Sequence, residues 1–137
     1  MVSHPQLHLM TKLLNIEGVT VKSYQIIENI GITIYLDNNN KKAISTVGKK
    51  TDKLHQNHSY VVRDLPLGEQ KVYLQVNRRQ MRCEGCPQKF SEDLEFVKKT
   101  RTYTERLKKK ILSELLESEL KNVAQRNGVS EQEIETM

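Results

Sequence analysis

Cys83 and Cys86 are the residues of this chain whose type and spacing point most directly to chemistry. They have two residues between them and directly follow the basic run 78–82, which ends a stretch of alternating apolar residues. A Cys-x-x-Cys turn at the end of a basic strand is half of a zinc ribbon, because structural zinc needs four ligands in a closed tetrahedral site. A complete metal site would therefore need two more ligands from elsewhere in the sequence.

The second pair of potential ligands is His55 and His58, and 24 residues separate this pair from Cys83. The four residues make up the set of a Cys₂His₂ site, although their spacing is not that of the usual zinc finger. The alternative is that the histidines are solvated and that the cysteines are reduced thiols in a knuckle-like turn. The sequence predicts either no cofactor or weakly bound zinc, with Cys83, Cys86, His55 and His58 as the candidate ligands.

Positive charge is concentrated in the segment that starts at the end of this strand. Residues 78–110 hold eleven Lys or Arg and five Asp or Glu, whereas residues 111–137 hold two and six. Lysine and arginine neutralise phosphates irrespective of base sequence, so the basic segment favours DNA as a partner. A solvated basic surface is the alternative. The candidate DNA-binding residues are Arg78, Arg79, Arg82, Lys98, Lys99, Arg101, Arg106, Lys108, Lys109, Lys110 and Gln132.

Hydrophobic periodicity predicts the elements that carry these residues. A short helix is expected over residues 5–15. Alternation of apolar and polar residues then predicts strands, and the Asp-Leu-Pro segment at 64–66 is expected to end the fourth of them. The predicted strands lie around residues 19–22, 32–36, 43–47, 60–63 and 72–77.

A helical period replaces this alternation after residue 91. Thr102 and Glu105 form a capping-box pair that is expected to open a helix, and Ser118 is expected to cap the next one. Gly128 suits the left-handed residue that follows a helix end. A helix, a short helix, a turn with glycine and a further helix make up the helix-turn-helix layout.

The last predicted helix opens with a capping box of Ser130 and Glu133. In a helix-turn-helix protein this helix presents its first residues to base edges. Gln132 can pair with adenine. The neighbouring acidic residues are unfavourable near phosphates, so packing among the three helices is the alternative role of this helix.

These patterns predict an α+β fold in two parts. Residues 1–90 are expected to form a small antiparallel β module with a degenerate zinc ribbon, and residues 91–137 a three-helix helix-turn-helix segment. The sequence has no apolar run of about 18 residues, no signal-peptide pattern and no catalytic constellation. The prediction is a cytoplasmic chain with no membrane partner, no small-molecule substrate and no enzymatic activity of its own.

The order of these features resembles the N-terminal region of prokaryotic insertion-sequence transposases of the ISL-three type. The similarity runs over nearly the whole chain, and its most specific part is Asp64-Leu65-Pro66 followed by Arg78-Arg79 and the Cys-x-x-Cys turn. Segments 101–107 and 123–130 continue it. The resemblance implies a zinc ribbon and a helix-turn-helix, followed in such transposases by a catalytic domain with an acidic DDE triad.

Two features depart from that family pattern. The positions expected to hold the first Cys-x-x-Cys are occupied by Ile44 and Val47, which cannot bind zinc and are expected to make a dry apolar contact. The chain also stops within the last predicted helix. The catalytic domain is therefore expected to be absent, as in a truncated, decayed or separately encoded copy.

The resemblance implies a DNA-binding N-terminal module that recognises the terminal repeats of an insertion element without cutting them. Its expected partners are DNA and a full-length transposase chain. Two alternatives remain open at this point. One is a protein-interaction module that packs against a partner transposase without reading DNA, and the other is a small helix-turn-helix transcriptional regulator.

Overall fold

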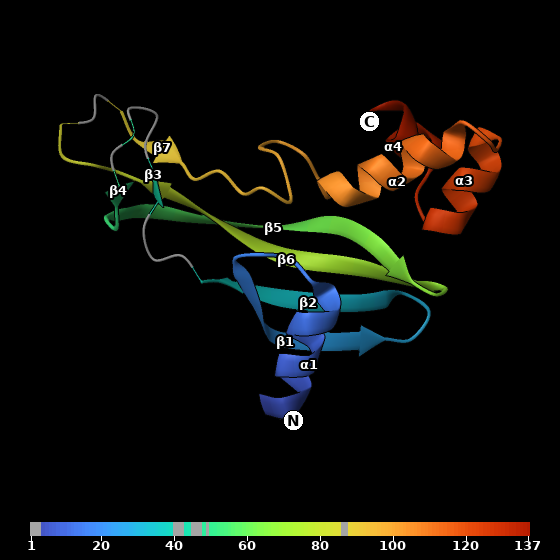
Figure 1. Cartoon of the computed structure of the whole chain (residues 1–137), viewed down its shortest axis with the longest axis horizontal. Helices are drawn as coiled ribbons and strands as arrows, with labels where there is room; N and C mark the ends of the chain where they lie inside the picture. The colour runs from blue at the N-terminus through green and yellow to red at the C-terminus, as the bar shows by residue number, and fades with distance from the viewer. Residues whose placement is uncertain (1–3, 40–42, 45–47, 49, 86–87) are drawn as a thin grey trace.

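The computed structural model describes residues 4–39, 43–44, 48, 50–85 and 88–137 of the chain. A sheet lies at its centre, with one helix at the start of the chain and three short helices at the end (Figure 1). In chain order the elements are α1 (His4–Leu14), β1 (Val19–Ile27), β2 (Gly31–Asn38), β3 (Ala43–Ile44), β4 (Lys50–Thr51), β5 (Leu54–Leu67), β6 (Gln70–Met81), β7 (Phe90–Ser91), α2 (Glu105–Leu115), α3 (Leu120–Asn127) and α4 (Glu131–Glu135).

Two antiparallel hairpins build the main sheet. β1 pairs with β2, and β5 pairs with β6. The hairpins meet where β2 runs parallel to β6, with Ile32 opposite Val72 and Tyr35 opposite Gln75. The strand order is therefore β1-β2-β6-β5, which leaves β5 at one edge; β7 pairs with the end of β6, and β3 pairs with β4 in a small separate sheet.

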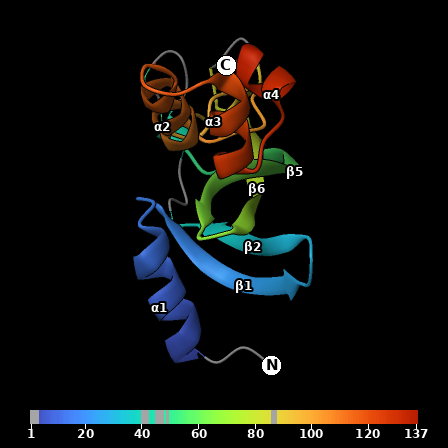
Figure 2. The ribbon, with the colours of Figure 1, turned by 90° about the vertical axis from the view of Figure 1, so that its right-hand side faces the viewer.

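One face of the main sheet carries the apolar core. Val21, Ile34, Leu74 and Val62 are buried on it, one from each of the four long strands. Side chains of α1 and of the segment 94–97 pack against the same cluster. Because successive side chains of a strand point to opposite faces, the residues in between line a second face that is mainly polar. Figure 2 shows α1 beside β1, with the three C-terminal helices beyond the β5–β6 hairpin.

The C-terminal helices surround a second apolar cluster, which includes Leu107 and Ile111 of α2, Val123 of α3 and Ile134 of α4. Local capping fixes where these helices begin and end. The hydroxyl of Thr104 accepts a hydrogen bond from the Leu107 amide at the start of α2. Gly128 takes a left-handed conformation, with φ 66°, at the end of α3.

The C-terminal helices are joined to the sheet through β5. The backbone of Arg63 pairs with the segment before α2: its amide donates to the Thr102 carbonyl at 2.8 Å, and its carbonyl accepts from the Thr104 amide at 2.9 Å. Next to it, the buried carboxylate of Asp64 accepts from the Thr104 hydroxyl at 2.7 Å and from Arg106 Nε at 2.8 Å. The start of α2 is therefore fixed to the edge strand.

The predicted fold class is wrong. The sequence indicated a small antiparallel β module followed by a three-helix segment, but the sheet is mixed, because β2 and β6 are parallel. The C-terminal helices have 11, 8 and 5 residues and do not follow the sheet as a three-helix bundle. Alternation of apolar residues identifies strands but does not give their direction or neighbours, which explains the error.

Three predicted boundaries were also wrong. The second C-terminal helix has Glu119 and not Ser118 at its N-cap. The fourth strand continues through Pro66 to Leu67, because β5 is an edge strand with a register irregularity between Asp64 and Leu67, where a missing amide is tolerated. The first C-terminal helix is capped by Thr104 and not by Thr102, whose carbonyl pairs with the Arg63 amide. The capping box of the last helix is confirmed, and the division of the chain into two domains stays a prediction.

Candidate nucleic-acid interface

The arginines at the end of β6 occupy different environments. Arg78 follows Val72, Leu74 and Val76 at a spacing of two, so its side chain points to the apolar core face. It is only 6% exposed. Its guanidinium donates to the carbonyls of Glu92 at 2.7 Å and Val97 at 2.9 Å, and to the Tyr60 hydroxyl. These internal bonds hold the segment after β7 against the sheet.

The side chain of Arg79 points to the other face of the sheet, and it also binds a partner within the fold. Its Nε lies 2.8 Å from Oε2 of Glu92, a buried carboxylate that also accepts from the Arg79 amide. Asn38 Nδ2 donates to the second oxygen of the same carboxylate at 2.8 Å. The pair therefore joins β2, β6 and the segment after β7, and it uses the charge of Arg79 inside the fold.

Arg106 has a similar structural role at the other end of β5. It makes a two-point ion pair with the buried Asp64, through Nε and Nη2. Its Nη1 also donates to the Leu14 carbonyl at 2.6 Å, so one side chain connects α2, β5 and the end of α1. Arg78, Arg79 and Arg106 thus have named structural partners, and their assignment to DNA stays a prediction.

The remaining candidate cations lie at the surface. Arg82, Lys98, Arg101 and Lys109 are exposed, and Lys108 is half-buried. The other two are exposed but have acidic neighbours within the fold. Lys99 Nζ lies 3.1 Å from the exposed carboxylate of Asp93, and Lys110 Nζ lies 3.5 Å from Glu114. The Lys99–Asp93 pair is exposed and contributes little free energy, so Lys99 keeps most of its ability to bind an anion. Lys110 Nζ also donates to the side chain of the buried Asn127 at 2.8 Å.

These exposed cations are distributed along the edge strand. Arg82 follows the end of β6 and lies beside the start of β5, where its amide donates to the Lys53 carbonyl at 3.0 Å. The segment 92–104 runs beside β5 toward α2 (Figure 1), and it carries Lys98, Lys99 and Arg101. α2 carries the last three lysines beyond the end of the strand. The exposed cations therefore follow β5 on one side of the sheet, where the segment 92–104 also carries the exposed carboxylates of Asp93 and Glu95.

Gln132 is exposed on α4, as a base-reading role would require. The three acidic residues of this five-residue helix, Glu131, Glu133 and Glu135, are exposed as well. The structure does not bring Gln132 into contact with any of the candidate cations by a described hydrogen bond or ion pair. Its role stays a prediction.

A hollow of about 470 Å³ opens between β5 and the segment 99–102. Its walls include Tyr60 and Arg78 on the sheet, and Lys99 and Arg101 on the facing segment. We call this hollow the Arg78 groove. The Arg101 guanidinium lies over the ring of Tyr103, 6.0 Å from its centroid.

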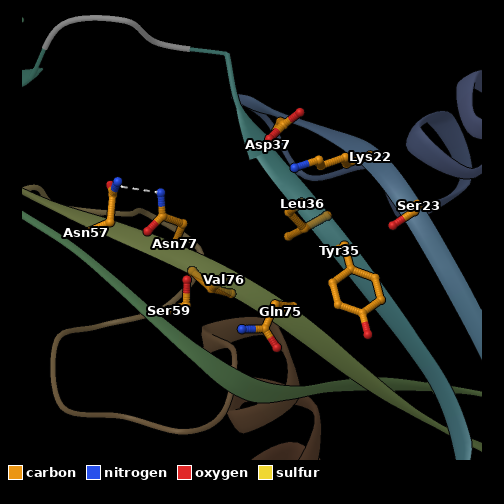
Figure 3. Close-up of a pocket in the computed structure, with 10 residues that line it drawn as sticks. All are labelled: Lys22, Ser23, Tyr35, Leu36, Asp37, Asn57, Ser59, Gln75, Val76 and Asn77. Carbon is orange, nitrogen blue, oxygen red and sulfur yellow. Dashed lines mark hydrogen bonds between the residues drawn. The ribbon is translucent and has the colours of Figure 1, made fainter.

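A second hollow of about 340 Å³ lies on the polar face of the sheet (Figure 3). Asn77 donates to the side chain of Asn57 at 3.1 Å, and Gln75 lies further along β6, toward Tyr35. Lys22 and Asp37 line the same hollow, so it contains one positive and one negative charge. The hollow is therefore polar but without a net positive charge, in contrast to the Arg78 groove.

The candidate zinc ligands do not form a metal site in the part of the chain that the structure describes. His55 and His58 lie on the extended strand β5 and not in a polar loop. No group of three or more His, Cys, Asp or Glu residues is placed to hold a metal ion among the described residues. Cys86 and Val47 lie outside the described residues.

Sequence reasoning missed two residues of this region. Tyr60 was assigned only to a strand, and Asp64 only to a chain-stopping segment. The i, i+2 series from Val72 to Arg78 was the available signal that Arg78 points inward. A buried arginine needs oxygen partners, and a strand that pairs with β6 is where such partners are expected.

Comparison with known proteins gives one match. A family model described as the zinc-finger of transposase IS204/IS1001/IS1096/IS1165 matches residues 48–86, less than half of the chain. The matched segment contains β4, β5 and β6. No curated protein and no solved structure matches the chain. Within the described residues, no helix has the length and apolar character needed to cross a membrane.

Proposed function

We propose that this chain is a DNA-binding module related to the zinc-finger region of insertion-sequence transposases, and that it recognises the ends of an insertion element. The observation that carries this proposal is the match of residues 48–86 to the zinc-finger of that transposase family. The match covers the hairpin of β5 and β6, beside which the exposed cations lie.

The size of the basic side supports duplex DNA as the ligand. β5 has 14 residues, which at about 3.3 Å per residue gives a length of about 45 Å. One turn of B-DNA extends about 35 Å along its axis. A duplex that lies along β5 would therefore pass the exposed cations beside this strand within little more than one turn, where they can neutralise its phosphates.

Cutting and joining of DNA are assigned in this proposal to a partner. The resembled transposases use an acidic triad in a separate catalytic domain, and the module proposed here supplies binding alone. A full-length transposase chain is the proposed protein partner. Co-purification of the two tagged chains with and without element-end DNA tests this part independently of DNA binding.

The DNA-binding proposal is tested by fluorescence anisotropy with a labelled duplex over a series of salt concentrations. The logarithm of the association constant is expected to fall with the logarithm of salt concentration, by about 0.9 for each neutralised phosphate. Replacement of two exposed lysines, K98Q with K109Q, should reduce this slope by about two units. A preference for element-end sequences over a scrambled duplex is expected in addition.

The matched control replaces two exposed lysines elsewhere in the fold. Lys12 lies on α1 and Lys22 on β1, at the opposite edge of the sheet from β5. K12Q with K22Q removes the same charge and should leave the slope unchanged. Equal losses in the two double variants would mean that net charge alone drives binding. Absence of binding at low salt would overturn the proposed function.

A further inference from the structure

Arg78 presents an unusual electrostatic situation. Its guanidinium is buried, and its described partners are all neutral oxygens: the carbonyls of Glu92 and Val97, and the hydroxyl of Tyr60. Among the described residues no carboxylate forms an ion pair with it, and the side chain of Glu92 is instead engaged by Arg79. A buried charge without a counter-charge is costly, so this arrangement favours an anion nearby.

The Arg78 groove provides the space for such an anion. Arg78 lies on one wall, and Lys99 and Arg101 lie on the other. No acidic residue lines the hollow among the described residues. Asp93 lies outside the lining and forms an ion pair with Lys99. The side chain of Asp93 is 89% exposed, so this ion pair is weak. Three basic residues and no acidic residue therefore line one open hollow among the described residues.

Hydroxyl groups in the lining of the groove can donate hydrogen bonds to the oxygen atoms of a phosphate. The Tyr60 hydroxyl accepts hydrogen bonds from Arg78 Nε and Nη2 at 3.2 and 3.0 Å. A phenol that accepts from a guanidinium still has its own proton to donate. Ser91 and Thr102 add hydroxyl groups to the lining. Donation from hydroxyl and charged groups to an anionic oxygen gives stronger hydrogen bonds than neutral pairs do.

We propose that the Arg78 groove binds a phosphate group, with Arg101 and Lys99 as charged contacts and the Tyr60 hydroxyl as a donor polarised by Arg78. This part rests on the proposed function: the bound group is a phosphodiester of the DNA backbone. The same chemistry fits free inorganic phosphate, and the two sources are separated by the experiment below. Arg78 is a positioning residue in this site, because it acts through the Tyr60 hydroxyl and through its buried charge.

The first arm of the experiment titrates inorganic phosphate into the ¹⁵N-labelled chain at constant ionic strength, against sodium chloride. Amide shifts are expected at residues 58–60 and 99–102. Y60F should weaken phosphate binding about tenfold, as expected for loss of one hydrogen bond to a charged group. R101Q should weaken it by a similar factor. Y35F is the control, because Tyr35 lines the other hollow on the polar face.

The second arm measures DNA affinity against salt for the same variants. R101Q should reduce the salt slope by about 0.9, the value for one phosphate. Y60F should lower DNA affinity about tenfold with an unchanged slope, because it removes a donor and not a charge. If circular dichroism shows that Y60F is unfolded, K99Q and R101Q carry the test alone, since both replace exposed side chains.

The outcomes separate the groove from the proposed function. Phosphate binding at the groove without DNA binding would support the phosphate site and overturn the DNA-binding function. DNA binding that is unchanged in R101Q, K99Q and Y60F, with no amide shifts at the groove, would overturn the site and leave the function standing. Phosphate-induced shifts confined to another surface would also overturn the site.

Discussion

At the scale of single residues, two arginines of the basic run 78–82 should differ in how much their replacement changes the free energy of unfolding. R79Q removes the partner of the buried Glu92 carboxylate, so it should lower the free energy of unfolding by about 3 kcal/mol. R82Q replaces an exposed side chain and should change it by less than about 0.5 kcal/mol. Urea denaturation followed by circular dichroism measures both values.

The variants R79Q and R82Q also distinguish an arginine that stabilises the fold from one that binds DNA. R82Q should reduce the salt slope of DNA binding by about one unit, while the folded fraction stays unchanged. A stable R79Q protein, or a destabilised R82Q protein, would contradict the contacts described here. Each variant loses one positive charge, so the comparison is free of any effect of net charge.

The sequence identified positive charge but could not assign its use. A count of lysines and arginines treats Arg78, Arg82 and Arg106 alike, whereas the fold gives two of them buried oxygen partners. Those partners, the Glu92 carbonyl and the Asp64 carboxylate, are 14 and 42 positions away in the sequence. Contacts at such separation depend on the sheet order, which single-sequence periodicity does not contain.

At the scale of elements, the junction between the two hairpins depends on one glycine. Gly31 begins β2 with φ 141°, and a Cβ atom there would lie 2.4 Å from the Lys71 carbonyl oxygen. G31A should therefore lower the free energy of unfolding by about 3 kcal/mol, from overpacking and backbone strain together. Gly68 also has a positive φ but open space around it, so G68A should cost only about 1 kcal/mol.

Thermal and urea unfolding of G31A and G68A measure this difference directly. The two variants make the same chemical change in two turns of one sheet, so propensity alone predicts similar losses. Equal destabilisation would show that the close approach of Gly31 to β6 does not limit stability. A stable G31A would mean that β2 and β6 are not joined in the register described here.

Local signals of the sequence predicted several elements correctly. The helix at the start of the chain, the strands β1, β2 and β6, the left-handed Gly128 and the capping box of α4 are all present. Each depends on residues within a few positions of one another. The parallel pairing of β2 with β6 and the Arg78 groove depend instead on distant segments, which explains why the sequence did not reveal them.

At the scale of the whole molecule, zinc is not expected to stabilise the fold. The matched family is described as a zinc-finger, but Ile44 and Val47 stand at the positions where the family resemblance places its first pair of cysteines. Protein purified with a reducing agent and without added zinc should contain well below one zinc per chain by atomic emission spectroscopy. I44C with V47C should introduce zinc binding and raise the melting temperature, because structural zinc contributes folding free energy.

Stoichiometric zinc that survives a mild chelator would contradict this expectation. The variant H55A then identifies whether histidine completes the ligand set with the two cysteines. Failure of the double cysteine variant to bind zinc would instead show that Ile44 and Val47 are not the positions of the missing ligands.

The parallel junction of β2 and β6 also has a consequence for the order of folding. Each hairpin closes between segments that are near in sequence, whereas Ile32 and Val72 are 40 positions apart. Closing a long loop costs more entropy, so we expect both hairpins to be formed in the transition state before they meet. Stopped-flow refolding tests this: V61A in the β5–β6 hairpin should slow folding, whereas I32V at the junction should mainly accelerate unfolding.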